Sequence, residues 1–155
     1  FIRKRRFMKQ IFIDTNVIID FLADRQPSSD YAAMIFQLAK DGKVGVHISA
    51  ISFNNTYYIL RKVTSHKNAL KLLSEIEEYI GVQETNRKII KKAMKSDFKD
   101  FEDAIQYFSA VQIGNIDIIA TRDLKDFKKS ELPVLSPETT IKLLLEEIPA
   151  GNNAL

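Results

Sequence analysis

The feature that most limits the possible folds is a regular alternation of short apolar, β-branched runs with longer segments of helical spacing. In the longer segments apolar residues recur at i, i+3 and i+4, as they do in amphipathic helices. Strands separated by helices predict a parallel sheet with helices on both faces, that is, a three-layer α/β/α sandwich of about five strands. The expected strands are residues 11–13, 44–49, 79–83, 116–121 and 133–136.

Several polar residues stand where helices should begin. Thr15 or Asn16 is expected to cap a short helix after the first strand, and Ser52 a helix after the second. A helix with a clear apolar stripe should start near Asp100, and Ser136, followed by a proline, should cap the last one. The helices expected after the first, second and fifth strands therefore begin close to strand ends.

The composition limits which catalytic and metal-binding groups the chain can use. The chain of 155 residues has no cysteine, which excludes disulfides, thiol nucleophiles and cysteine-bound zinc. Its only histidines are His47 and His66, too few for an all-histidine metal site. A metal would need oxygen ligands, as Mg²⁺ or Mn²⁺ does.

The chain carries a formal net charge of +3, and part of it lies in "FIRKRRF", before Met8. We interpret residues 1–7 as a basic N-terminal extension, residues 8–148 as a single domain and residues 149–155 as a flexible tail. A mildly basic charge is compatible with a nucleic-acid partner. No apolar stretch reaches the roughly 20 residues of a membrane span, so we expect a cytoplasmic protein.

Acidic residues follow two of the expected strands. In "IFIDTNVIID", Asp14 comes directly after the first strand, and Asp123 follows the fourth in "IIATRDLKDF". Asp103 lies near the start of the helix with the clear apolar stripe. If the first and fourth strands are neighbours, these carboxylates meet at the carboxyl edge of the sheet, where α/β proteins bind ligands. Because converging like charges repel, a divalent cation is the natural partner.

Each of these residues also has a purely structural interpretation. Asp14 can cap a helix, and Asp100 and Asp103 can lie on a solvated helix face. Asp123 and Asp126 can be turn residues.

Uncharged neighbours can support the acids. Thr15 and Thr121 each stand beside an acid at a strand end, where they can orient carboxylates, although β-propensity also explains them. We also count Asn16 among the supporting residues, and Arg122 is the nearest candidate to hold an RNA backbone.

In their order, "DTNVIID", "DAIQYFSA" and "IIATRDLKDF" resemble the acidic motifs of the PIN-domain nuclease family. The resemblance covers most of residues 8–145, and "DFEDAIQ" is similar to a bacterial, toxin-like branch. It implies a divalent-metal-dependent ribonuclease, often the toxin of a toxin–antitoxin pair. An RNA substrate, an antitoxin protein and a homodimer are the partners it suggests.

By position, the resemblance makes Asp14, Asp103 and Asp123 the metal-site and catalytic acids. The family usually has a glutamate where this chain has Asn55, and Asp100 offers a replacement charge one turn before Asp103. The alternative function is a catalytically weak PIN-like module that binds RNA or a protein. Dinucleotide-binding and P-loop proteins are disfavoured, because the five glycines never form a phosphate-binding loop.

Overall fold

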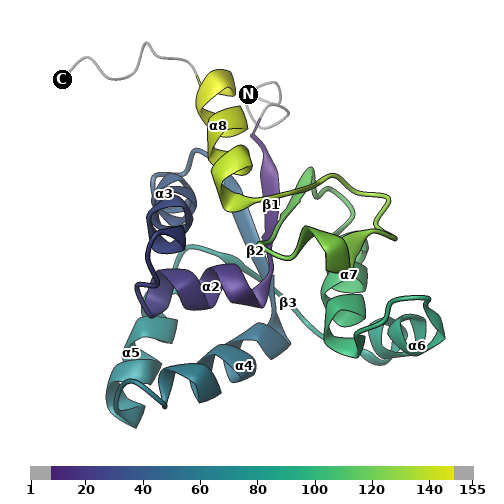
Figure 1. Ribbon diagram of the computed structural model, residues 1–155, viewed down its shortest axis with the longest axis horizontal. Coiled ribbons are helices and arrows are strands. Elements are labelled where there is room, and N and C mark those ends of the chain that lie inside the picture. Colours follow the sequence, from purple (N-terminus) through teal and green to yellow (C-terminus); the bar gives the residue numbers. More distant parts are fainter. Residues whose placement is uncertain (1–7, 149–155) are drawn as a thin grey trace.

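A computed structural model of the protein describes residues 8–148, so the expected extension and tail lie outside the described residues. Its centre is a five-stranded sheet of order β3-β2-β1-β4-β5 in which all neighbours pair in parallel (Figure 1). The strands are β1 (Gln10–Ile13), β2 (Gly45–Ser49), β3 (Gly81–Gln83), β4 (Ile118–Ala120) and β5 (Val134–Leu135). The predicted α/β fold with a parallel sheet is confirmed.

Alternate residues of the central strand pack into different cores. Ile11 and Ile13 of β1 belong to a core shared with α2 (Thr15–Leu22), α3 (Ser28–Lys40) and α8 (Pro137–Glu147). Phe12 points to the other face and packs against α7 (Phe101–Ile113). Because successive strand residues face opposite ways, a strand buried on both faces is apolar throughout.

The remaining helices extend these layers. α4 (Ala50–Leu60) contacts α2 and packs with α5 (His66–Glu77), while α6 (Arg87–Lys95) packs against α7 (Figure 1). Among the described residues, no helix has both the length and the apolar character needed to cross a membrane.

Two expected helix starts are wrong. Asp14, not Thr15 or Asn16, caps α2, because its carboxylate accepts a hydrogen bond from the Thr15 amide at 2.8 Å. α4 begins directly after β2 with Ser49 at the N-cap position, so Ser52 lies inside the helix and is buried. The helix start expected near Asp100 and the cap expected at Ser136 are confirmed.

Register brings two strand ends together. Ile13 of β1 pairs with Ala120 of β4, and the Asp14 amide extends this ladder by donating to the Ala120 carbonyl at 3.0 Å. Asp14 and Thr121, the next residues, therefore lie side by side at the carboxyl edge of the sheet.

Candidate active site

Asp14 is the buried centre of the candidate site. Only 4% of its surface is exposed, and Thr121 donates a hydrogen bond to its Oδ2 at 2.8 Å. Oδ1 accepts from the Thr15 amide as the cap of α2. Both interpretations of Asp14 are thus compatible, since the helix cap holds the carboxylate at the strand edge.

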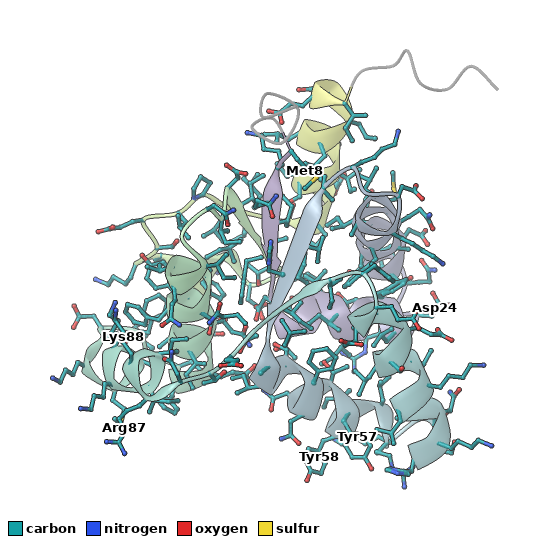
Figure 2. All side chains as sticks on the ribbon, turned by 180° about the vertical axis from the view of Figure 1, so that it is seen from behind. Met8, Asp24, Tyr57, Tyr58, Arg87 and Lys88 are labelled. Atoms are coloured by element: carbon teal, nitrogen blue, oxygen red, sulfur yellow. The ribbon has the colours of Figure 1, made fainter. Side chains whose placement is uncertain are left out.

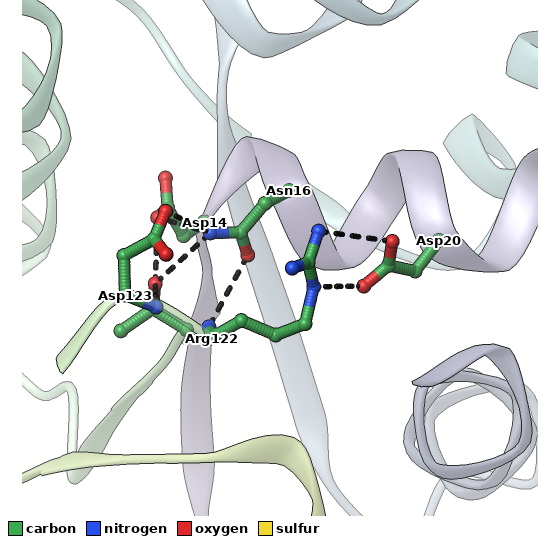
Figure 3. A network of polar contacts seen from close by, with 6 residues as sticks. Asp14, Asn16, Asp20, Arg122 and Asp123 are labelled. Atoms are coloured by element: carbon green, nitrogen blue, oxygen red, sulfur yellow. Dashed lines mark hydrogen bonds and ion pairs between the residues drawn. The ribbon is translucent and has the colours of Figure 1, made fainter. Parts of the chain in front are cut away.

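Asn16 links Asp14 to Asp123. Its Nδ2 donates to Asp123 Oδ2 at 3.0 Å and lies 3.3 Å from both Asp14 Oδ2 and Thr121 Oγ1 (Figure 3). Its Oδ1 accepts from the Arg122 amide at 3.3 Å. One side chain at the start of α2 therefore holds the segment after β4.

Asp103 reaches the site from the first turn of α7. Its amide donates to Oδ1 of the N-cap residue Asp100 at 3.0 Å. The pKa of Asp103 is raised from 3.8 to about 7. Burial is the largest cause, followed by the negative charges of Asp14, Asp100, Asp126 and Glu102 in that order. Asp103 thus lies in the negative field of the other acids.

The pKa of Asp14 is raised as well, from 3.8 to about 6. Burial is the main cause, and the negative charges of Glu102 and Asp123 add to it. The hydrogen bonds from Thr121 and Thr15 act in the opposite direction by stabilising the carboxylate. Glu102, which sequence reasoning missed, therefore belongs to the acidic cluster, although it stands directly before Asp103 in the same motif.

This donor set fits a hard divalent cation in charge and in atom type. The groups are carboxylate, hydroxyl and amide oxygens, and the acids raise one another's pKa. Within residues 8–148, however, no three acidic or histidine side chains lie at the mutual spacing of metal ligands. The Asn16 amide bridges Asp14 and Asp123 instead.

Arg122 has a partner that the sequence did not reveal. Its guanidinium forms an ion pair with Asp20 of α2, through Nε to Oδ2 and through Nη2 to Oδ1 at 3.2 Å (Figure 3). The Asp20 side chain is 2% exposed and that of Arg122 is 39% exposed. Arg122 therefore ties the segment bearing Asp123 to α2, and only its other N–H groups are left for the expected RNA contact.

Three buried polar side chains form a hydrogen-bonded cluster beside the acids of the site. Gln106 Nε2 of α7 donates to Thr15 Oγ1 at 3.1 Å and to Ser52 Oγ at 3.0 Å, and these two hydroxyls are 2.9 Å apart. All three residues are buried. The cluster joins α2, α4 and α7 next to Asp14. Its one sequence signal was a glutamine about one turn after Asp103 in the same helix.

Two supporting candidates lie at the border of the site. Asn55 is half-buried on α4, one turn beyond Ser52, and no hydrogen bond of its side chain is found among residues 8–148. Asp126 lies in the 3₁₀ turn η1 (Leu124–Phe127), where its amide donates to the Asp123 carbonyl at 3.0 Å. It is thus a turn residue that also adds negative charge near Asp103.

The parallel sheet, its helical layers and these acids define an α/β protein with an acidic site at its strand ends. The PIN-domain family matches residues 10–125, and the chain therefore belongs to this family. The family resemblance inferred from the sequence is confirmed.

Known relatives agree with this assignment. The chain is 28% identical over 138 residues to a protein of Aquifex aeolicus (strain VF5) named Ribonuclease VapC1, covering 84% of this chain and 92% of that protein. Two solved structures share the fold at low sequence identity. The VapBC2 structure from Rickettsia felis, bound to a promoter DNA fragment, has a TM-score of 0.61 at 15% identity, covering 82% of this chain and 98% of that one. A toxin–antitoxin complex from Klebsiella pneumoniae has a TM-score of 0.59 at 20% identity, with coverages of 82% and 97%.

Proposed function

We propose that the protein is a divalent-metal-dependent ribonuclease that hydrolyses RNA phosphodiester bonds. The observation that carries this proposal is the acidic cluster around Asp14, in which the pKa of Asp14 is raised to about 6 and that of Asp103 to about 7. Perturbed acids at a sheet edge mark functional sites. Family membership and a relative named as a ribonuclease support the choice of RNA.

Asp14, Asp103 and Asp123 would hold Mg²⁺ or Mn²⁺. When bound, such a cation activates water and neutralises charge on the phosphate that is attacked. The chain itself prepares the ligands: Thr121 and the Thr15 amide fix the Asp14 carboxylate, and Asn16 positions Asp123. Hydrolysis by water in line with the leaving 3′-oxygen gives a 5′-phosphate and a 3′-hydroxyl.

The partners belong to the same proposal. The protein acts as the toxin of a toxin–antitoxin pair in the cytoplasm, and it is inhibited by an antitoxin protein. Support comes from a structural neighbour whose name describes such a complex. A homodimer remains our expectation for its assembly.

Asn55 favours a second candidate function. An amide at the usual glutamate position brings no charge to a metal, which suits a catalytically weak module that binds RNA or a protein. The two functions differ in their response to Mn²⁺, because a ligand bound only by the folded state raises the melting temperature. The ribonuclease should show that shift, and a pure binding module should not.

RNA cleavage with and without Mn²⁺ tests the proposal, using the wild type, Asp103→Asn and the control Asp97→Asn. Asp97 is an exposed acid on the segment before α7 and is not among the charges that raise the pKa of Asp103. We expect metal-dependent cleavage by the wild type and the control, loss of cleavage in Asp103→Asn, and products with 5′-phosphates. No cleavage of several RNAs by folded, metal-loaded wild type would overturn it in favour of the binding module.

A further inference from the structure

Helix α6 carries a dense basic surface that the acidic site does not use. Five of its nine residues are cations, and it contains no acidic residue. All five are exposed, and Figure 2 shows Arg87 and Lys88 pointing outward at a corner of the molecule. We call this set the basic strip; it consists of Arg87, Lys88, Lys91, Lys92 and Lys95.

The strip follows from the two faces of the helix. Ile89 and Ala93 are buried against Ala104 and Ile105 of α7. The cations occupy the opposite side in two rows with i, i+4 spacing, so neighbours in a row lie about 6 Å apart along the axis. The strip is therefore a regular linear array of charges on a helix that packing holds in place.

The five cations of the strip have no ion-pair partner in the described part of the chain, because the ion pairs found among residues 8–148 involve none of them. Like charges at i, i+4 destabilise a helix. Arg87 and Lys88 also occupy the first turn, where the helix dipole favours acids. An anion bound to the strip would reduce both the repulsion between the cations and their unfavourable interaction with the helix dipole.

The helix that carries the strip packs against α7, the helix that carries Asp103. α6 packs on Ala104 and Ile105, the two residues that follow Asp103 in α7. Figure 1 shows α6 beside the end of α7 at which that helix starts. The acidic cluster itself repels phosphates. Cations outside the cluster are therefore needed to hold a polyanionic substrate near the active site.

We propose that the basic strip of α6 binds the phosphate backbone of single-stranded RNA and holds the part of the strand that runs beyond the cleaved phosphate. This rests on the proposed ribonuclease function for the identity of the polyanion. Lysines and one arginine without interleaved acids match a chain of regularly spaced phosphates. The open hollow between them, about 500 Å³ in volume, is lined by these five cations alone and has no aromatic side chain on which a base could stack. Binding here should therefore be strong at low salt and indifferent to sequence.

Equilibrium binding to a short fluorescein-labelled oligouridine in EDTA, measured by anisotropy at several salt concentrations, tests the strip without cleavage. The variant is Lys88→Gln/Lys92→Gln, and the matched control is Lys67→Gln/Lys71→Gln on α5, whose lysines are also exposed and spaced i, i+4. All proteins keep residues 1–7, so the basic extension contributes equally. Thermal melts of each variant check that the exposed substitutions leave the fold intact.

We expect the α6 variant to bind more weakly than the wild type, whereas the control should bind like the wild type. The salt slope of the α6 variant should fall by about 0.7 for each phosphate that its side chains no longer neutralise. In cleavage assays the same variant should raise KM with little change in kcat. Equal affinity and equal salt slope for all three proteins would overturn the inference, as would equal weakening in the α6 variant and the control. The ribonuclease proposal fails separately, if the wild type binds RNA through α6 but never cleaves it.

Discussion

Helix α2 and its N-cap carry two buried aspartates with opposite electrostatic surroundings. Asp14 caps its start and is 4% exposed, and Asp20, six residues later, is 2% exposed. Asp20 has a guanidinium partner in Arg122. Asp14 has only hydroxyl and amide donors, and further acids lie nearby. Two carboxylates on one helix are therefore buried for different reasons.

This difference separates a structural acid from a functional one. A buried carboxylate normally needs a cation or several donors to offset its lost hydration. The Asp20 charge is met by Arg122 within the fold. The charge of Asp14 is opposed by Glu102 and Asp123, which is understandable if a bound metal ion completes the site. Four predictions test this contrast, from the largest expected effect to the smallest.

The largest effect should be on catalysis. Asp14→Asn removes a ligand charge from the site, so we expect Mn²⁺-dependent RNA cleavage to fall by more than the roughly 10- to 100-fold that the loss of an outer-shell partner costs. Asp20→Asn, assayed in parallel as folded protein, should retain a much larger share of the wild-type rate. Equal losses of activity in the two variants would show that the contrast along α2 has no catalytic meaning.

The second effect concerns stability and is asymmetric. Arg122→Ala leaves the Asp20 carboxylate buried without a partner, which should destabilise the fold by about 3–5 kcal/mol. Asp20→Ala should cost less, because the Arg122 side chain is 39% exposed and can regain water. Urea unfolding of both variants and of the double variant measures this. A larger loss of stability for Asp20→Ala than for Arg122→Ala contradicts the assignment.

The third effect is the pH dependence of the metal-free protein. The pKa of Asp14 is 3.8 unfolded and about 6 folded, and that of Asp103 rises to about 7. Between these values the unfolded chain has lost protons that the folded chain retains, so the free energy of unfolding should decrease as pH rises from about 4 to about 7. Denaturation in EDTA at several pH values checks this. Asp14→Asn should flatten the slope below pH about 6, and an unchanged slope in that variant would contradict the assignment to Asp14.

The smallest effect is a gain. Asn55→Glu places a carboxylate at the family's usual second acidic position, so Mn²⁺ affinity should increase, by roughly tenfold at most. Calorimetric titration compares the variant with Asn54→Glu, its exposed neighbour on α4. Tighter binding in the Asn54 variant alone would mean that Asn55 does not face the site.

The strand pattern in the sequence predicted which strand ends form the site, but not which side chains contact one another within it. Register between β1 and β4 depends on apolar runs that the sequence displays, so the meeting of Asp14 with the segment after β4 could be expected. The Asp20–Arg122 pair joins residues 102 positions apart in the chain, and no local sequence pattern predicts such an ion pair. This pairing gives Arg122 a structural role, and the expected RNA contact stays a prediction for its remaining N–H groups.

The hydroxyl groups beside the acids also show that local sequence patterns do not predict long-range contacts. Ser52 had the residue type of a helix cap, but α4 starts two residues earlier and buries it against Thr15 and Gln106. Cap propensity is a local property, whereas the position of the helix start depends on how closely α4 follows β2. Glu102 was overlooked for a related reason, since its effect on Asp14 requires the three-dimensional approach of α7 to β1.

The most direct test of the contrast along α2 is the change in melting temperature on adding Mn²⁺ to the wild type, Asp14→Asn and Asp20→Asn. Because a bound ligand stabilises the folded state, the wild type should melt higher with Mn²⁺. The shift should disappear in Asp14→Asn and persist in Asp20→Asn, even though the latter melts lower without metal. An equal shift in the wild type and Asp14→Asn, or no shift in the wild type, would contradict a metal site at Asp14.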